Sequence, residues 1–277
     1  MIIWIASYPK SGNTWLKLFL SAYLGNHKDP NTFDINKVMI PFSLFPTNSL
    51  IKKFDVDYSN FNNLSKNWLP MQEYLNLTAS KIFVKTHNAM CTINGNPFTN
   101  SKQSLGAIYL VRDPRDIIMS YSDHLQKTHE DVVKNLLSSN TFEEGIIDSK
   151  KYNFTLLGSW SDHYNSWKNF KGINVLVIKY EDLVNNTFLT FEKIIKYLSS
   201  IIEISVNEDR INECIEITKF DNLKNIEQKD GFNEKGYGKY FFRVGKVGDW
   251  KTKLNKELVK KIEKKFYKEM IELGYLD

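Results

Sequence analysis

The residues best suited to bind an anion lie near the start of the sequence. Residues 7–15 read Ser-Tyr-Pro-Lys-Ser-Gly-Asn-Thr-Trp and lie between an apolar run at 2–6 and an apolar-periodic segment at 16–24. A strand that breaks at Pro9, turns through Gly12 and opens a helix points backbone N–H groups at an anion, which the helix dipole also favours. The side chains here that add charge or hydrogen-bond donors are Lys10, Ser11, Asn13 and Thr14. We therefore predict an anion-binding loop at residues 7–15, called the cradle below.

The cradle differs from the usual nucleoside-triphosphate loop. A Walker A loop has two glycines separated by four residues, followed by Lys and then Ser or Thr. Residues 7–15 do not contain this pattern. An ordinary ATP or GTP site is therefore disfavoured. The predicted ligand of the cradle is still a phosphate-like group.

A basic pair stands at the end of the next apolar run, in the sequence Val-Lys-Thr-His-Asn. Lys85 and His87 are two residues apart, so they lie on the same side of an extended segment. A base beside a cation suits the transfer of an anionic group to a hydroxyl or an amine. The other histidines are rivals for the base but have no cation partner at the end of a strand: His27, His124, His129 and His163.

A third apolar run leads into Arg112 and a helix that carries Ser120. An arginine next to a helix N-terminus can bind a phosphate through paired hydrogen bonds. The alternative is a surface arginine paired with Asp113 or Asp116. The sequence alone leaves both interpretations open.

Two segments fit no regular element: residues 26–69 and residues 226–248. Long irregular segments in compact domains are usually functional. We expect the first to form an acceptor-side wall and the second, which contains Gly245 and Gly248, to be a cofactor lid whose backbone approaches a ligand closely. The many aromatic residues in 26–69 predict either an apolar acceptor pocket or core filling. Further acceptor contacts are expected from residues 88–100 and 126–153.

Taken together, the motifs resemble those of the sulfotransferases that use 3'-phosphoadenosine 5'-phosphosulfate (PAPS). The cradle is similar to the family's Tyr-Pro-Lys-Ser-Gly-Thr-Thr-Trp loop, with Asn13 as the departure, and residues 85–87 match its Lys-Thr-His motif. An Arg followed by a Ser eight positions later, and Arg-Lys-Gly-Xaa-Xaa-Gly-Asp-Trp with Val244 in place of Lys, complete the resemblance. It spans residues 2 to about 251, in the family's order.

The resemblance implies roles for individual residues. His87 would be the general base, Lys85 an assisting cation, and Lys10 the group that stabilises charge on the bridging oxygen. The implied cofactor-binding residues are Lys10, Ser11, Gly12, Asn13, Thr14, Trp15, Arg112, Ser120, Tyr180, Thr218, Phe220, Arg243, Val244 and Gly245. Of these, Tyr180 and Trp15 have an alternative interpretation as packed aromatic residues. No metal is implied, because Lys and Arg would neutralise the phosphates.

The elements that must position these residues alternate along the chain. Strands are predicted at 2–6, 81–85, 107–111 and 174–178, and helices at 14–24, 114–125, 156–169, 187–198, 208–217 and 256–273. This order predicts an α/β fold with a central parallel β-sheet flanked by helices and a P-loop-like phosphosulfate-binding loop. We expect one domain, residues 1–277, with ligands beyond the carboxyl ends of the strands.

Composition restricts the class of partner. The 277 residues carry a net charge of +5, which suits a polyanion such as a phosphorylated small molecule, a nucleic acid or a membrane surface. The lysines in residues 260–265 lie at helical spacing beside Glu263, which favours a solvated helix face over a nucleic-acid patch. Runs of at most about six apolar residues at the N-terminus predict neither a membrane span nor a signal, so a cytoplasmic protein is expected. Cys91 and Cys214 are expected to be free thiols.

The sequence therefore predicts transfer of a sulfuryl group from PAPS to a hydroxyl or amine of a small-molecule acceptor, with adenosine 3',5'-bisphosphate (PAP) as product. One alternative is an ATP-dependent nucleotide or small-molecule kinase, which would need a Walker-type loop and a metal-binding Asp. Another is a non-catalytic module that binds nucleic acid or another polyanion, which would need clustered surface cations. The acceptor and the oligomeric state are not readable from the sequence.

Overall fold

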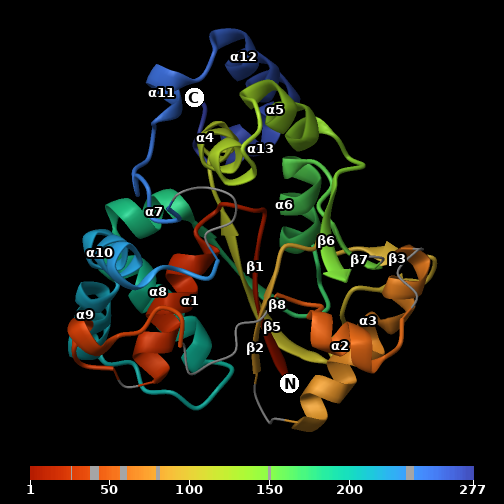
Figure 1. Cartoon of the computed structure of the whole chain (residues 1–277), viewed down its shortest axis with the longest axis horizontal. Helices are drawn as coiled ribbons and strands as arrows, with labels where there is room; N and C mark the ends of the chain where they lie inside the picture. The colour runs from red at the N-terminus through yellow and green to blue at the C-terminus, as the bar shows by residue number, and fades with distance from the viewer. Residues whose placement is uncertain (26, 38–43, 57–60, 79–81, 149–150, 235–239) are drawn as a thin grey trace. The chain divides into compact units, whose positions relative to one another are not determined.

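The computed structural model describes residues 1–25, 27–37, 44–56, 61–78, 82–148, 151–234 and 240–277. Figure 1 shows the elements along the chain. The strands are β1 (Ile2–Ser7), β2 (Ile82–Thr86), β3 (Thr92–Ile93), β4 (Asn96–Pro97), β5 (Ser104–Val111), β6 (Phe142–Asp148), β7 (Lys151–Leu156) and β8 (Asn174–Lys179). The helices are α1 (Asn13–Leu24), η1 (Pro30–Thr32), α2 (Asn48–Lys53), α3 (Phe61–Thr78), α4 (Pro114–Leu125), α5 (His129–Leu137), α6 (Trp160–Lys168), α7 (Tyr180–Asn185), α8 (Thr187–Ser199), α9 (Glu208–Ile217), α10 (Phe220–Asp230), α11 (Trp250–Lys253), α12 (Lys256–Lys265) and α13 (Tyr267–Glu272).

A four-stranded sheet in the order β2-β1-β5-β8 forms the centre of the fold (Figure 1). Strand β1 pairs in parallel with β2, with Ala6 opposite Thr86, and in parallel with β5, with Ser7 opposite Leu110. All four strands correspond to the four predicted from apolar runs. The prediction of an α/β fold with a central parallel sheet is confirmed.

The two inner strands, β1 and β5, are buried almost throughout because their residues are almost wholly apolar. All six residues of β1 are buried, as expected for a parallel sheet covered on both faces. The fully buried Trp4 donates its indole N–H to Ser104 Oγ at 2.7 Å, so its polar atom is satisfied. Its ring lies 5.4 Å from Phe45 and 5.1 Å from Phe98, while Trp68 packs 5.3 Å from Phe98. Phe45 and Trp68, from the segment predicted as an acceptor wall, therefore fill the core.

The chain divides into two compact units, each built from three stretches of sequence. The first unit comprises Met1–Tyr8, Phe42–Leu110 and Ser138–Val177, which include β1, β2 and α6. The second comprises Pro9–Pro41, Val111–Leu137 and Ile178–Asp277, which include α1, α4 and α7. The cradle's Lys10 to Trp15 thus belong to the second unit, whereas Lys85 and His87 belong to the first.

Several predicted elements are wrong in extent. Residues 26–69 are not irregular throughout: the described part contains η1, α2 and the start of α3, and α3 even includes Pro70. The helix expected at 156–169 begins only at Trp160, because β6 and β7 pair as an antiparallel hairpin up to Leu156. A capping box between Ser159 and Asp162 then starts α6. Within the predicted lid, residues 226–230 are the last turns of α10.

The helix expected at 256–273 is two helices. α12 ends before Phe266, where the backbone leaves helical angles at φ −111° and ψ 20°, and α13 follows. Phe266 is fully buried, so the break lets its ring enter the core. No helix among the described residues combines the length and the apolarity that crossing a membrane requires.

Candidate active site

The cradle follows β1 directly and opens α1, as predicted. Gly12 is the N-cap residue at φ 100°, and no side chain caps this helix end. Lys10 also adopts a left-handed conformation, at φ 67°, which is uncommon for a residue with a side chain and marks a constrained turn. Ser11 Oγ is fully buried and has no hydrogen-bond partner among the described residues. An orphaned buried hydroxyl beside an uncapped helix start fits an anionic group of the cofactor.

Tyr180 lies directly against the cradle. A Cβ on Gly12 would come within 2.6 Å of Tyr180 Cδ2, so only glycine allows this approach. On the ring, Arg112 places its guanidinium carbon 4.3 Å from the centroid. Burial raises the pKa of Tyr180, and the neighbouring Arg112 charge opposes that rise. Tyr180 is therefore a neutral, buried aromatic surface between a glycine and a cation.

Arg112 joins the cradle to the segment that follows α10. Its Nη1 donates to the Lys10 carbonyl at 3.2 Å and its Nη2 donates to the Lys246 carbonyl at 3.2 Å. Its position immediately after β5 and before the N-cap Asp113 is the one that the sequence predicts for a phosphate clamp. The guanidinium is thereby fixed in orientation, which favours paired contacts to a phosphate.

Residues 240–248, called the lid below, contact the cradle and α10. The ring of Phe241 lies 4.0 Å from Lys10 Nζ, and Glu227 accepts the backbone N–H groups of Phe241 and Phe242 at 2.6 and 2.8 Å. Arg243 donates to the Met119 carbonyl at 3.3 Å and pairs with Asp123. Residues 241–243 are therefore held against α4 and α10 by charged and backbone groups as well as by apolar packing.

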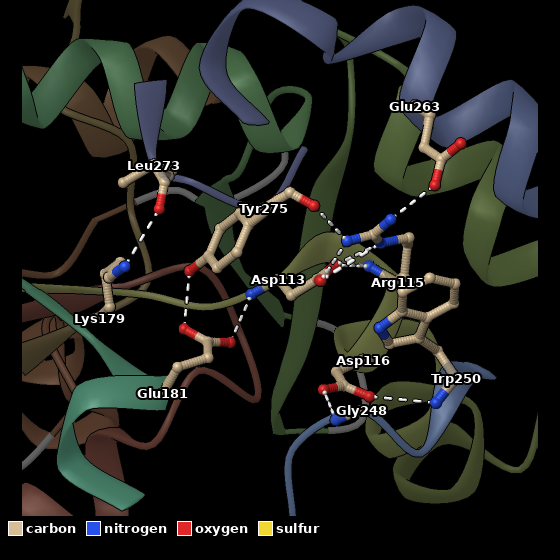
Figure 2. A network of polar contacts seen from close by, with 10 residues as sticks. All are labelled: Asp113, Arg115, Asp116, Lys179, Glu181, Gly248, Trp250, Glu263, Leu273 and Tyr275. Carbon is tan, nitrogen blue, oxygen red and sulfur yellow. Dashed lines mark hydrogen bonds and ion pairs between the residues drawn. The ribbon is translucent and has the colours of Figure 1, made fainter. Parts of the chain in front are cut away.

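Asp116 anchors the far end of the lid. Figure 2 shows its carboxylate accepting the backbone N–H groups of Gly248 at 2.7 Å and Trp250 at 3.2 Å. Burial raises the pKa of this carboxyl, while the two N–H donors and Arg112 oppose the rise. The carboxylate of Asp116 is thus occupied by the lid. The sequence analysis did not predict the contact of Asp116 with Gly248 and Trp250. An Arg-Asp-Pro-Arg-Asp run does not indicate which partner each of its two carboxylates binds.

A buried ionic network supports the residues on either side of Arg112 (Figure 2). Arg115 pairs with Asp113 at 2.7 Å and with Glu263 at 2.5 Å, donates to the Tyr275 carbonyl at 2.8 Å, and lies 3.8 Å from the centroid of the Trp250 ring. Glu181, next to Tyr180, accepts from the Asp113 N–H at 3.0 Å and from the Tyr275 hydroxyl at 2.7 Å. Asp113 is therefore engaged by Arg115, which argues against the alternative of an Arg112–Asp113 surface pair.

The remaining predicted cofactor-binding residues also lie in the second unit, and they differ in burial and in hydrogen-bond partners. Thr218 is fully buried and donates its hydroxyl to the Cys214 carbonyl at 2.7 Å, so that hydroxyl completes the end of α9. Trp15 makes edge contacts with Tyr180 at 6.5 Å and Phe191 at 5.6 Å. The side chain of Thr14 donates to Glu234 at 3.3 Å. The others that the structure describes are the buried Asn13 and the half-buried Ser120, Phe220 and Val244.

Glu234 is a second group that the sequence analysis missed. Its carboxylate pairs with the buried Lys17 on α1 and accepts from Thr14. It thus brings a negative charge to the first turns of α1. A single Glu in a glycine-rich segment gives no sequence signal of this kind.

His87 is fixed within the first unit. Its Nδ1 lies 2.8 Å from the Ser7 carbonyl and 3.3 Å from Ser7 Oγ. A carbonyl oxygen only accepts, so Nδ1 carries the proton and Nε2 carries the ring's basic lone pair. Lys85 and His87 are half-buried while Thr86 between them is fully buried, which agrees with the expected alternation along an extended segment.

His163 is not a rival base. It is fully buried, and this burial lowers the pKa of its imidazole to about 4. Both ring nitrogens are engaged, one by Tyr109 and one by the His87 carbonyl. A buried, occupied imidazole has no access to an acceptor. His129 is half-buried at the start of α5.

Among the residues that the structure describes, no group of three or more His, Cys, Asp or Glu side chains could hold a metal ion. Cys91 and Cys214 are free thiols, as predicted.

Gly245 provides a direct test of the lid. It adopts φ 64°, and a Cβ there would come within 2.3 Å of the Phe220 ring. We expect Gly245→Ala to displace the lid and to weaken binding of adenosine 3',5'-bisphosphate on the order of tenfold or more, because a side chain is strained at this φ and clashes as well. Isothermal titration calorimetry measures the effect. Gly95→Ala is the matched control, because Gly95 also has a positive φ, 80°, but no atom lies within 4 Å of its added Cβ. Equal affinities for the two variants would contradict the prediction.

Comparison with protein families and curated proteins gives a consistent result. A family model described as Sulfotransferase domain matches residues 2–274. The amine sulfotransferase of Oryctolagus cuniculus is 27% identical over 281 residues, which cover 97% of this chain and 80% of that protein. The flavonol 3-sulfotransferase of Flaveria bidentis is 25% identical over 276 residues, which cover 95% of this chain and 79% of that protein.

Among solved structures, mouse sulfotransferase SULT7A1 complexed with PAP is similar to this chain. The TM-score is 0.58 at 20% sequence identity, and the match covers 97% of this chain and 84% of the mouse chain. At this level of identity the similarity concerns the fold.

Proposed function

Since this chain belongs to the sulfotransferase domain family, we propose that His87 is the general base of its reaction and that the cradle and Arg112 bind the sulfate donor. The protein is a PAPS-dependent sulfotransferase that acts on a small-molecule acceptor. The observation that carries the assignment of the base is the Nδ1 contact of His87 to the Ser7 carbonyl, because it leaves the basic lone pair on Nε2.

In this proposal His87 and Lys85 act on the acceptor, whereas Lys10 and the rest of the cradle act on the donor. When bound, PAPS supplies the sulfuryl group and leaves as PAP. His87 Nε2 takes the proton of the acceptor hydroxyl or amine, and Lys85 adds positive charge near that step. Lys10 and the backbone N–H groups of the cradle stabilise negative charge on the bridging oxygen. Little covalent work falls to the protein, so positioning and charge stabilisation provide most of the rate.

The donor side is supported by the fit of the cradle. Ser11 Oγ is an orphaned buried donor, and the Gly12 backbone lies against the Tyr180 ring without room for a side chain. Ser11, Gly12, Asn13 and Thr14 would hold the 5'-phosphosulfate, and Arg112, Ser120, Arg243 and Gly245 the 3'-phosphate. Tyr180, Trp15, Thr218 and Phe220 would contact the adenosine. Val244 in place of the family's Lys and Asn13 in place of Thr bear on donor affinity rather than on reaction type.

The acceptor carries a hydroxyl or an amine. Relatives named for amines and for flavonols support both classes. Several relatives are named cytosolic sulfotransferases, which supports a cytoplasmic location for this chain. We further propose that residues 1–277 act as one sulfotransferase-like domain. We also propose that nucleic acid is not a partner, because Lys10, Lys85 and Arg112 lie at or just after the ends of strands.

The function is tested by incubating the protein with PAPS and panels of phenols, alcohols, amines and sugars while PAP release and sulfated product are measured. We expect product from at least one acceptor class, with the same rate in excess chelator, since Lys and Arg side chains neutralise the phosphates. Loss of activity on chelation would contradict the metal-free assignment. Mg²⁺-dependent ATP turnover without sulfate transfer would support a kinase instead.

Arg112 is expected to recognise the 3'-phosphate. We expect Arg112→Ala to weaken PAP binding by about 10-fold to 100-fold, the range for losing charge-assisted hydrogen bonds. The matched ligand is adenosine 5'-phosphate, which lacks the 3'-phosphate and whose affinity should change much less. An equal loss for both ligands in calorimetry would show that Arg112 acts through the Lys10 carbonyl and Tyr180 instead.

A further inference from the structure

One face of α6 contacts the backbone that carries the base. The segment after β2, residues 87–90, is called the base segment below. Trp167 donates its indole N–H to the Asn88 carbonyl at 2.9 Å, and Ser166 Oγ accepts the Met90 N–H at 3.0 Å. The third contact joins His163 Nε2 to the His87 carbonyl at 3.0 Å. The three side chains are spaced by three and four residues, so they share a helix face.

Hydrogen-bonding rules fix the protonation state of His163. The His87 carbonyl only accepts, so His163 Nε2 carries the proton and donates it. Nδ1 of His163 is then an acceptor, and the Tyr109 hydroxyl, 2.9 Å away, donates to it. Burial lowers the pKa of His163 to about 4, so the ring stays neutral and keeps this arrangement at neutral pH. Tyr109 and His163 are both fully buried.

The imidazole of His163 is also fixed by packing. The Tyr8 ring meets it edge-on with centroids 5.5 Å apart, and the Tyr109 ring lies 5.6 Å from it. A ring enclosed in this way has one orientation, so its Nε2–H bond has one direction. The carbonyl of His87 is therefore held in place by a rigid donor.

His87 is consequently restrained on two sides. Its side chain donates from Nδ1 to the Ser7 carbonyl, and its own carbonyl accepts from His163. The first contact sets which ring nitrogen is basic. The second sets the peptide plane from which the side chain projects. If the second is lost, the His87 carbonyl loses a donor and the peptide is free to rotate, which weakens the first.

We propose that His163 is a positioning residue for the general base: the Tyr109 hydroxyl, His163 and the His87 carbonyl form a relay of hydrogen bonds that holds the Nδ1 proton of His87 on Ser7. This rests on the proposed role of His87. The competing interpretation is that His163 is a satisfied core residue that contributes only to folding. The two differ in what happens to His87 in protein that remains folded.

The test compares variants of α6 in the full chain. His163→Leu keeps volume but removes both polar contacts, and His163→Gln offers an amide N–H in the place of Nε2–H. Ser166→Ala is the matched control, because it removes a bond from the same helix face to the same segment but at Met90 rather than at His87. It also removes the bond from Ser166 Oγ to the His163 carbonyl at 2.8 Å, which lies within α6, and it leaves both ring nitrogens of His163 with their partners. For each variant we would measure melting temperature, PAP affinity, kcat and KM, and the His87 tautomer by long-range 1H–15N NMR.

For His163→Leu we expect kcat to fall on the order of tenfold or more with unchanged PAP affinity, as for a slightly misplaced catalytic group. The His87 ring should lose its single Nδ1-protonated form. His163→Gln should recover most of both properties. Ser166→Ala should lower the melting temperature but leave the kcat of folded protein and the His87 tautomer unchanged.

The proposal is overturned if His163→Leu and Ser166→Ala are alike in kcat and in the His87 tautomer. Should His163→Leu fail to fold, His163→Asn takes its place, because its shorter amide stays near the Tyr109 hydroxyl but falls short of the His87 carbonyl. A mixture of His87 tautomers in that variant supports the relay. A single Nδ1-protonated form, as expected for the wild type, overturns it. The NMR result is independent of turnover, so it separates failure of this proposal from failure of the base assignment, which His87→Ala tests directly.

Discussion

His87→Ala should reduce kcat by about 10²-fold to 10⁴-fold, the range for removing a positioned general base. The physical reason is that Nε2 is the basic nitrogen of a ring whose Nδ1–H is bonded to Ser7. Without it, the acceptor proton has to pass to water. PAP affinity should remain close to that of the wild type, because His87 belongs to the acceptor side of the proposed reaction. Steady-state kinetics at saturating PAPS, with calorimetry for PAP, measure both quantities.

His124→Ala is the control for this experiment. His124 lies in the last turn of α4, is half-buried, and falls outside the segments expected to contact the acceptor. Its replacement should leave kcat unchanged. If His87→Ala keeps near-full turnover with bound donor, another group is the base and the assignment is wrong.

The second large effect is expected at Lys10. Lys10→Met keeps a long apolar stem and removes the charge, and we expect kcat to fall by about 10²-fold to 10³-fold, as for loss of one charge-stabilising donor. Affinity for PAP should fall less, because the charge that Lys10 stabilises grows only as the sulfuryl group departs. Lys10 Nζ also lies 4.0 Å from the centre of the Phe241 ring, a cation–π contact that adds a smaller contribution to holding residue 241 beside the cradle.

Lys196→Ala is the matched control, since Lys196 is an exposed lysine on α8 that pairs with Glu192. It should alter neither kcat nor PAP affinity. A Lys10→Met enzyme whose kcat is unchanged while PAP affinity drops strongly would show that Lys10 serves donor binding instead of catalysis.

Local signals explain which elements were predictable. The bounds of α4 and α9 match the prediction, because an N-cap side chain and an apolar period are properties of neighbouring residues. Asp113 accepts the Arg115 N–H at 2.9 Å as its N-cap position predicts. The four sheet strands were found for a similar reason, since a parallel sheet buried on both faces requires continuous apolar runs.

Elements without such local signals were missed. α3 is rich in Asn and carries Pro70, and its helical state follows from packing: its Trp68 fills the core beside Phe98. The β6–β7 hairpin is specified by pairing between its own two strands, which no single apolar run indicates. Tertiary contact overrides weak local preference in both cases.

By itself the sequence determined the reaction class, because its motifs occur together in the order of one family, whose model matches residues 2–274. The roles of the donor-site residues stay predictions. Only the tertiary structure decided which partner each charged group takes. Asp113 binds Arg115, Asp116 holds the lid, and Glu181 receives Tyr275 from far along the chain. It also decided that His163 is fully buried and contacts the His87 carbonyl, so that it is not a second base. The burial and the orientation of each charged side chain set these pairings, and both depend on residues that are distant in the sequence.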